Sequence, residues 1–122
     1  MEIIHGQLSY RIISCAMEVH RILGPGFSEK IYEEALAREF GARKIAYVRQ
    51  MKLEVSYKDW LIGEYFLDMV VDDKVILELK AVPVILPLHC AQALSYLKVA
   101  KLRLGIVLNF GAVKLTQKRI VL

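Results

Sequence analysis

The hydrophobic residues alternate with a period of two through three consecutive segments in the middle of the chain. These segments, 48–57, 61–71 and 75–82, are interrupted only by Lys58-Asp59 and Asp72-Asp73. A period of two is typical of β-strands, because successive side chains on a strand point to opposite faces. Strands joined by breaks this short pair antiparallel, since parallel neighbours need a long crossover. The pattern therefore predicts an antiparallel three-strand meander, around which the rest of the chain must fold.

Two helices are predicted before the meander. Residues 7–23 carry apolar side chains at a helical period, and Gly24-Pro25-Gly26 ends that segment. Ser28 is a suitable N-cap for a second helix that runs to about Phe40.

The second helix has one broad apolar stripe. A helical wheel at about 100° per residue places Glu29 inside the edge of this stripe, Glu33 just past the edge and Lys30 on the opposite side. The stripe consists of Ile31, Tyr32, Ala35, Leu36, Glu39 and Phe40. Glu29 and Glu39 are thus predicted to face inward or sideways, and we expect only one of them to have a function.

One more helix and two strands are predicted after the meander. Pro87 suits the first turn of a helix that runs to about Ala100. Residues 102–109 form an apolar run that fits a buried strand reached by a crossover, and residues 113–122 fit an edge strand. The order α-α-β-β-β-α-β-β predicts a single α/β domain over residues 1–122, with a mixed sheet that contains the meander and is flanked by helices.

Composition narrows the classes of protein. Of the 122 residues, 56% are hydrophobic and 25% are charged, which fits one packed core, and the net charge of +4 permits a polyanionic partner without requiring one. The longest apolar stretch, 81–88, is short and contains Pro83 and Pro87, so no membrane span is expected. Cys15 and Cys90 lie in helix-like apolar contexts typical of buried thiols in a reducing compartment, and no basic-then-apolar leader opens the chain. We therefore expect a cytoplasmic protein.

Charged side chains in the meander indicate a site. Glu78 and Lys80 are two residues apart on an otherwise apolar strand, so they share one face. Burying such charges costs several kcal/mol unless they are paired, metal-bound or catalytic. With a two-residue loop between the strands, Asp68 would lie opposite Leu77 and point away from Glu78. With a three-residue loop or a bulge, Asp68 would lie opposite Glu78 on the same face.

A shared site for Asp68 and Glu78 favours a cation. Two carboxylates about 4 Å apart repel by about 4 kcal/mol at an effective dielectric of 20, and a divalent ion reverses the sign of that interaction. Oxygen ligands without a His or Cys cluster favour Mg²⁺ or Mn²⁺ over zinc. Lys80 would then lower the pKa of an attacking water or neutralise a phosphoryl oxygen, and Glu29 would add an acid from the helix.

Several motifs together resemble a known group of proteins. Asp68 followed by Glu78-x-Lys80, in this order of helices and strands, resembles the PD-(D/E)XK nuclease superfamily. Gly26-Phe27-Ser28-Glu29-Lys30-Ile31-Tyr32 matches Gly-x-x-Glu-x-x-Tyr, the signature of the small GxxExxY family placed in that superfamily. Three further segments are similar to that family, namely Leu23-Gly24-Pro25-Gly26, Gln92-Ala93-Leu94-Ser95-Tyr96 and Asn109-Phe110-Gly111. Leu67 replaces the proline in the superfamily's name, at a position that varies widely among its members.

The resemblance implies a restriction-endonuclease-like core and a metal-dependent nuclease that hydrolyses phosphodiester bonds with Mg²⁺ or Mn²⁺. It also implies that the substrate is nucleic acid, with DNA favoured over RNA. Asp68, Glu78 and the Leu79 carbonyl would bind the metal, and Lys80 would assist the water. The remaining implied site residues are Glu29, which completes the acidic cluster, and the pair Gln92 and Tyr96, which orients substrate.

Other interpretations stay open. Glu78 and Lys80 could simply pair with each other, and Glu29 could be a first-turn acid favoured by the helix dipole. Gln92 and Tyr96 could be ordinary surface residues one helical turn apart. The chain could also be a catalytically silent nucleic-acid-binding or protein-interaction module, a homodimer, or a protein recruited by a partner. Basic residues near the C-terminal end are either a solvated face or a surface for phosphates: Lys98, Lys101, Arg103, Lys114, Lys118 and Arg119.

Overall fold

The computed structural model describes residues 3–122, and its element order confirms the predicted α-α-β-β-β-α-β-β arrangement. The elements are α1 (Gly6–Leu23), α2 (Glu29–Ala42), β1 (Tyr47–Tyr57), β2 (Trp60–Val71), β3 (Val75–Lys80), α3 (Pro87–Ala100), β4 (Leu104–Asn109) and β5 (Thr116–Val121). Within the described residues, no helix is both long enough and apolar enough to cross a membrane.

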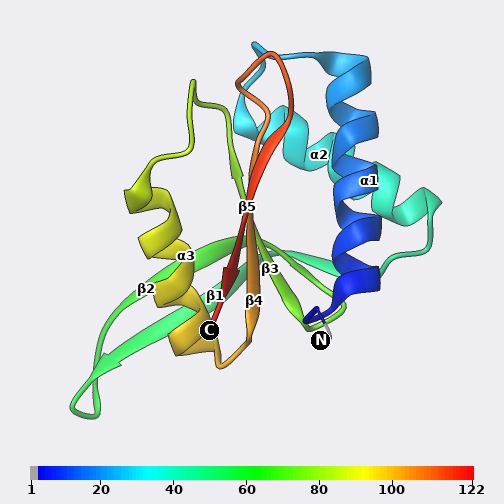
Figure 1. The fold of residues 1–122 in the computed structure, drawn as a ribbon. Coiled ribbons are helices and arrows are strands. Elements are labelled where there is room, and N and C mark those ends of the chain that lie inside the picture. Colours follow the sequence, from blue (N-terminus) through cyan, green and yellow to red (C-terminus); the bar gives the residue numbers. More distant parts are fainter. Residues whose placement is uncertain (1–2) are drawn as a thin grey trace.

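The strands form one mixed sheet in the order β1-β2-β3-β4-β5. β1, β2 and β3 are the predicted antiparallel meander. β4 lies parallel to β3 and antiparallel to β5, because α3 provides the crossover that parallel neighbours require. Helices α1 and α2 lie on one side of the sheet and α3 lies on the other (Figure 1). This mixed α/β arrangement agrees with the expected restriction-endonuclease-like fold.

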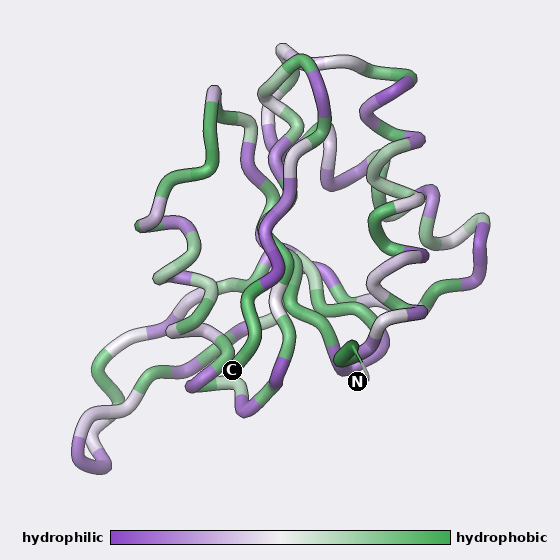
Figure 2. Tube along the Cα trace, in the orientation of Figure 1, coloured by the Kyte–Doolittle hydropathy of each residue, from purple (hydrophilic) through white to green (hydrophobic). Residues whose placement is uncertain are grey.

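The two sides of the sheet have separate hydrophobic clusters. The larger cluster joins α1 and α2 to the sheet, and a smaller cluster lies under α3 around Leu97 and Ile76. The central strands β3 and β4 are buried on both sides, so their sequences are almost continuously apolar, as the green tube of these strands shows (Figure 2).

The loop between β2 and β3 decides the register that the sequence left open. Val71 pairs with Val75, so the loop has three residues, of which Asp72 and Asp73 have left-handed φ angles of 52° and 54°. The β2–β3 pairs end at Met69↔Leu77, one residue short of Asp68 and Glu78. The three-residue loop is therefore confirmed.

Some local predictions were wrong, and others were confirmed only in part. Ile31 is 47% exposed, whereas Glu33 is 6% exposed, so the buried face of α2 is rotated toward Glu33. Glu33 can be buried because Arg49 and Gln50 on β1 donate hydrogen bonds to its carboxylate. Ser28 occupies the N-cap position of α2, but its side chain makes no capping hydrogen bond. Cys15 is buried as expected, but Cys90 is partly exposed because only one side of α3 covers the sheet.

Candidate active site

A buried tyrosine fixes the start of α2. Tyr32 is fully buried, and its hydroxyl donates a hydrogen bond to the Gly24 carbonyl and accepts one from the Phe27 N–H. Its ring stacks on Phe110 with a centroid distance of 4.6 Å and an interplanar angle of 10°. The Tyr of the Gly-x-x-Glu-x-x-Tyr segment thus ties the preceding loop to the end of β4, and this contact places Glu29 at the first turn of α2.

A second buried anchor fixes the end of β3. Asn109 is fully buried and makes three hydrogen bonds: its Oδ1 accepts from the N–H groups of Val82 and Gly111, both at 3.0 Å, and its Nδ2 donates to the Val82 carbonyl at 2.9 Å. A Cβ on Gly111 would lie 2.3 Å from the Val82 nitrogen, so only glycine fits there. Because Asn109 takes both backbone groups of Val82, β3 ends at Lys80 rather than continuing to Val82 as predicted.

Strand β2 changes faces at Asp68. Leu67 belongs to the cluster under α3, whereas Met69 belongs to the cluster under α1 and α2. Residues two apart share a face in a regular strand, so the alternation is broken between them. Across from Asp68 in the register lies Gln50, whose φ of 52° is unusual for a non-glycine residue. The β2–β3 pairs end at Met69, next to this irregular position, and the β1–β2 hairpin then diverges from β3 and extends toward α3 (Figure 1).

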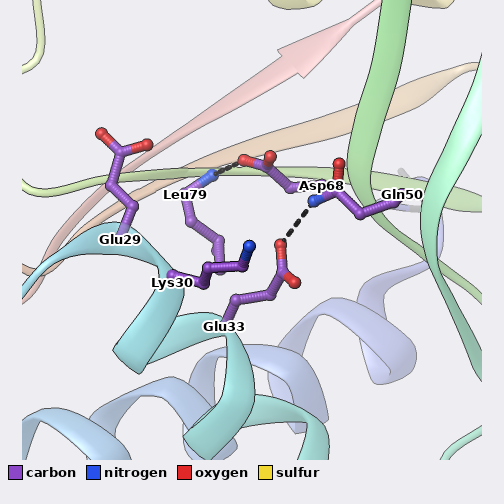
Figure 3. A pocket seen from close by; sticks show the side chains of 6 residues that line it. All are labelled: Glu29, Lys30, Glu33, Gln50, Asp68 and Leu79. Atoms are coloured by element: carbon purple, nitrogen blue, oxygen red, sulfur yellow. Dashed lines mark hydrogen bonds between the residues drawn. The ribbon is translucent and has the colours of Figure 1, made fainter.

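Asp68 and Glu78 form a pair of neighbouring carboxyls. Asp68 Oδ2 accepts a hydrogen bond of 2.8 Å from the Leu79 N–H (Figure 3). Glu78 is 9% exposed, and within the described residues its Oε1 is buried with no hydrogen-bond partner. Burial raises the pKa of Glu78 to about 8, and the Asp68 carboxyl adds to this shift. Burial also raises the pKa of Asp68.

Lys80 and Tyr96 lie on the same side of the sheet as Glu78, since Lys80 is two residues further along β3 and Tyr96 packs against the cluster that contains Ile76. The Lys80 ammonium opposes the pKa shifts of both carboxyls. Burial and then the charge of Glu78 raise the pKa of the Tyr96 hydroxyl on α3. Gln92, one turn earlier on α3, is exposed and lines an adjacent groove with Tyr96. The structure thus places Tyr96 on the Glu78 side of the sheet and Gln92 at a neighbouring exposed surface.

The cleft on the α2 side has a volume of about 300 Å³. Its lining residues are Glu29, Lys30, Glu33, Gln50, Asp68 and Leu79 (Figure 3). Glu33 is the buried acid: its Oε2 accepts from Arg49 at 2.9 and 3.0 Å, and its Oε1 accepts from Gln50 at 2.8 Å. Glu29 is exposed, and its carboxyl group points away from Glu33 and Gln50 (Figure 3). Glu29 and Asp68 therefore share a cleft, but the acid held inside it is Glu33.

Three residues of this cleft were missed in the sequence. Glu33 is one helical turn after Glu29, so the i, i+4 spacing could have identified it as a neighbour on the same side. Lys30, placed opposite the apolar stripe by the helical wheel, also lines the cleft. Gln50 could not have been identified from the sequence. Its backbone is left-handed, but the alternating strand around it contains no Gly, Asn or Asp that would indicate such a conformation.

The residues around Asp68 and Glu78 fit a hard divalent cation. Once Glu78 has lost its proton, its unpartnered Oε1 and the neighbouring Asp68 carboxyl would carry negative charge that a cation can compensate. Within residues 3–122, no three His, Cys, Asp or Glu side chains form a ready metal-binding group, so backbone and water oxygens would complete the ligand set. Mg²⁺ is usually held in this way, by one or two carboxylates and several waters.

Comparison with known proteins identifies the family. A model of the PD-(D/E)XK nuclease superfamily matches residues 6–120, a range that includes all the predicted site residues. No curated protein and no solved structure matches the chain. The match covers nearly the whole sequence and agrees with the mixed five-stranded sheet. The chain belongs to the PD-(D/E)XK nuclease superfamily.

Proposed function

We propose that the chain, acting as one domain, hydrolyses phosphodiester bonds of nucleic acid, with DNA preferred over RNA, using Mg²⁺ or Mn²⁺. The observation that carries this proposal is the buried, unpartnered Oε1 of Glu78 beside Asp68. Buried polar atoms are nearly always hydrogen-bonded in stable folds, so an exception of this kind favours a functional role. Members of the superfamily are generally nucleases, which favours hydrolysis as that role.

Asp68, Glu78 and the Leu79 carbonyl would hold the metal ion. The N–H and C=O of one residue in an antiparallel strand point toward the same neighbour. Since the Leu79 N–H donates to Asp68, the Leu79 carbonyl points toward the same side, beyond the last recorded β2–β3 pair Met69↔Leu77. When bound, the ion would polarise a phosphoryl oxygen and lower the pKa of a bound water.

The remaining site residues act on the substrate and the attacking water. Lys80 supplies a positive charge beside the carboxyls, where it neutralises a phosphoryl oxygen or orients the water. The Tyr96 hydroxyl is protonated at neutral pH, since the ordinary tyrosine pKa of 10.0 is raised further here, so it can donate a hydrogen bond to a phosphate oxygen. Glu29 provides an acid at the rim of the cleft, and Gln92 contacts the substrate.

Glu33 has a different role because its carboxylate already accepts hydrogen bonds from Arg49 and Gln50. It is a positioning residue: through Gln50 it holds the irregular part of β1 that lies across from Asp68.

A cleavage assay tests the proposal. Purified protein is incubated with labelled single- and double-stranded DNA and RNA in the presence of Mg²⁺ or Mn²⁺. Asp68→Asn and Glu78→Gln should each reduce the cleavage rate by about 10²-fold or more, because each removes charge that stabilises the reaction. Asp72→Asn is the matched control, since Asp72 is an exposed acid in the nearby β2–β3 loop. Cleavage by Asp68→Asn at the control's rate would exclude Asp68 from the mechanism. A wild-type protein that binds DNA but cleaves none of the substrates would instead be the silent binding module.

A further inference from the structure

A second hollow lies on the α3 side of the sheet, between α3 and the β1–β2 hairpin, and has a volume of about 340 Å³. We call it the hairpin groove. Its lining is mostly apolar and includes the rings of Tyr65 and Tyr96, with Gln92 and Ser95 as the polar groups. Figure 1 shows the long hairpin reaching past α3 at this place.

The hairpin groove lies on the same side of the sheet as Glu78. Tyr96 lines the groove and packs against the cluster under α3 that contains Ile76. Glu78 is two residues after Ile76 on β3, so its side chain is on that side of the sheet. The Tyr65 ring lies 5.2 Å from the Tyr96 ring at an angle of 50°, and Tyr65 is 52% exposed. An accessible aromatic surface therefore lies on the side of the sheet that carries Glu78.

Positive charge gathers in the part of the chain that forms α3, β4 and β5. Residues 81–122 contain six Lys and Arg residues and no Asp or Glu, whereas residues 1–80 contain eleven Lys and Arg against thirteen Asp and Glu. Lys98 on α3 is exposed, as are Lys101 and Arg103 just after it. Lys118 on β5 is two residues before Ile120, which packs in the cluster under α3, so Lys118 lies on the same side of the sheet. The hydrophilic middle of β5 is visible in Figure 2. This charge favours a polyanionic occupant over an apolar peptide.

We propose that the hairpin groove binds an unpaired nucleobase of the substrate, so that the substrate class is single-stranded nucleic acid or frayed ends. This inference rests on the proposed nuclease function and names its substrate class. Aromatic side chains bind unpaired bases through their exposed π-faces, whereas bases inside a duplex are stacked on each other and cannot present a face. Gln92 and Ser95 can form hydrogen bonds with the edge of the base, and the flanking lysines can contact the phosphates.

A binding assay without metal tests the inference separately from cleavage. Fluorescence anisotropy is measured in EDTA at fixed salt with three labelled probes of about twelve nucleotides: a single strand, the same strand with abasic nucleotides, and a blunt duplex. Tyr65→Leu should weaken single-strand binding by roughly 5- to 100-fold, because stacking contributes about 1–3 kcal/mol per base, and should leave duplex binding unchanged. Wild-type protein should bind the abasic strand as weakly as Tyr65→Leu binds the normal strand.

Two control variants complete the experiment. Tyr65→Phe keeps the ring and should bind like wild type, and Tyr10→Leu replaces an exposed tyrosine on α1 and should have no effect. Equal affinity of wild-type protein for the normal and abasic strands would overturn the inference, as would unchanged binding by Tyr65→Leu. If cleavage persists in that case, the nuclease function stands and only the base site fails. If the protein binds bases but cleaves no substrate, the base site stands and the nuclease function fails.

Discussion

Two buried polar side chains on neighbouring central strands have opposite environments. Asn109 on β4 is fully buried, and its side-chain amide makes three hydrogen bonds to backbone groups. Glu78 on the adjacent β3 is 9% exposed, and in the described part of the chain its Oε1 has no partner. Burial raises the pKa of Glu78 to about 8. The satisfied amide stabilises the fold, whereas the unsatisfied carboxyl costs stability, which is expected of a group kept for its chemistry.

Replacing Glu78 by glutamine should have the largest effect on the free energy of unfolding, because it removes the unsatisfied carboxyl. Folded Glu78 has a pKa of about 8 against an ordinary value of 4.5, so the folded state holds a proton that the unfolded state loses between these pH values. Metal-free wild-type protein should therefore lose stability relative to Glu78→Gln as the pH rises from about 4.5 to 8. Above pH 8 the difference should reach roughly 3–5 kcal/mol, and at pH 4 it should be small.

Urea denaturation of both proteins between pH 4 and 9, with EDTA present, measures this difference. Glu54→Gln is the control, because Glu54 is exposed on β1 and its replacement should change the free energy of unfolding by less than about 0.5 kcal/mol. A Glu78→Gln difference that does not change with pH would show that the buried carboxyl is already compensated inside the protein.

Disrupting the hydrogen bonds of Asn109 should have the next largest effect on the free energy of unfolding. Gly111→Ala places a Cβ 2.3 Å from the Val82 nitrogen, so the backbone must move and the hydrogen bonds of Asn109 are distorted. We expect a loss of about 3 kcal/mol in the free energy of unfolding. Gly63→Ala is the matched control, because a Cβ there meets no atom within 4 Å, and its unfolding midpoint should stay close to that of wild type. Similar midpoints for the two variants would contradict the close packing of the turn.

A smaller loss of stability is expected when a hydrogen-bond partner of Glu33, the buried acid of α2, is removed. Arg49→Met removes the guanidinium that donates to Glu33 and leaves this buried carboxylate with Gln50. The expected loss is about 2 kcal/mol, since one partner of a largely buried pair is removed. Arg38→Met removes an exposed partner of Glu34 and should cost less than about 0.5 kcal/mol. Thermal unfolding of both variants compares them, and equal melting temperatures would remove Arg49 from this role.

Most of the fold could be predicted from hydrophobic period and turn residues. The meander and the crossover helix follow from local patterns that do not depend on distant contacts. The register of β2 and β3 was reduced to two alternatives, because loop length fixes which residues lie opposite each other, and the structure has the three-residue loop.

The site was less predictable where one element depends on another. Glu33 is buried because Arg49 and Gln50 reach it from β1, and no helical wheel contains that information. The change of face between Leu67 and Met69 depends on how the hairpin packs against α3, which is a property of the assembled sheet. Glu29 was predicted from its place on the wheel and from the motif, yet the first turn of α2 leaves it exposed.

The most direct test of the central claim is to count the protons released when a metal ion binds. Mn²⁺ is titrated calorimetrically into wild-type protein and Glu78→Gln at pH 7, in two buffers with different ionisation enthalpies. Because Glu78 is mostly protonated at pH 7 and must lose its proton to bind an ion, wild type should release about one proton per ion, and Glu78→Gln should bind weakly without this release. Tight binding to both proteins with no proton release would contradict the account.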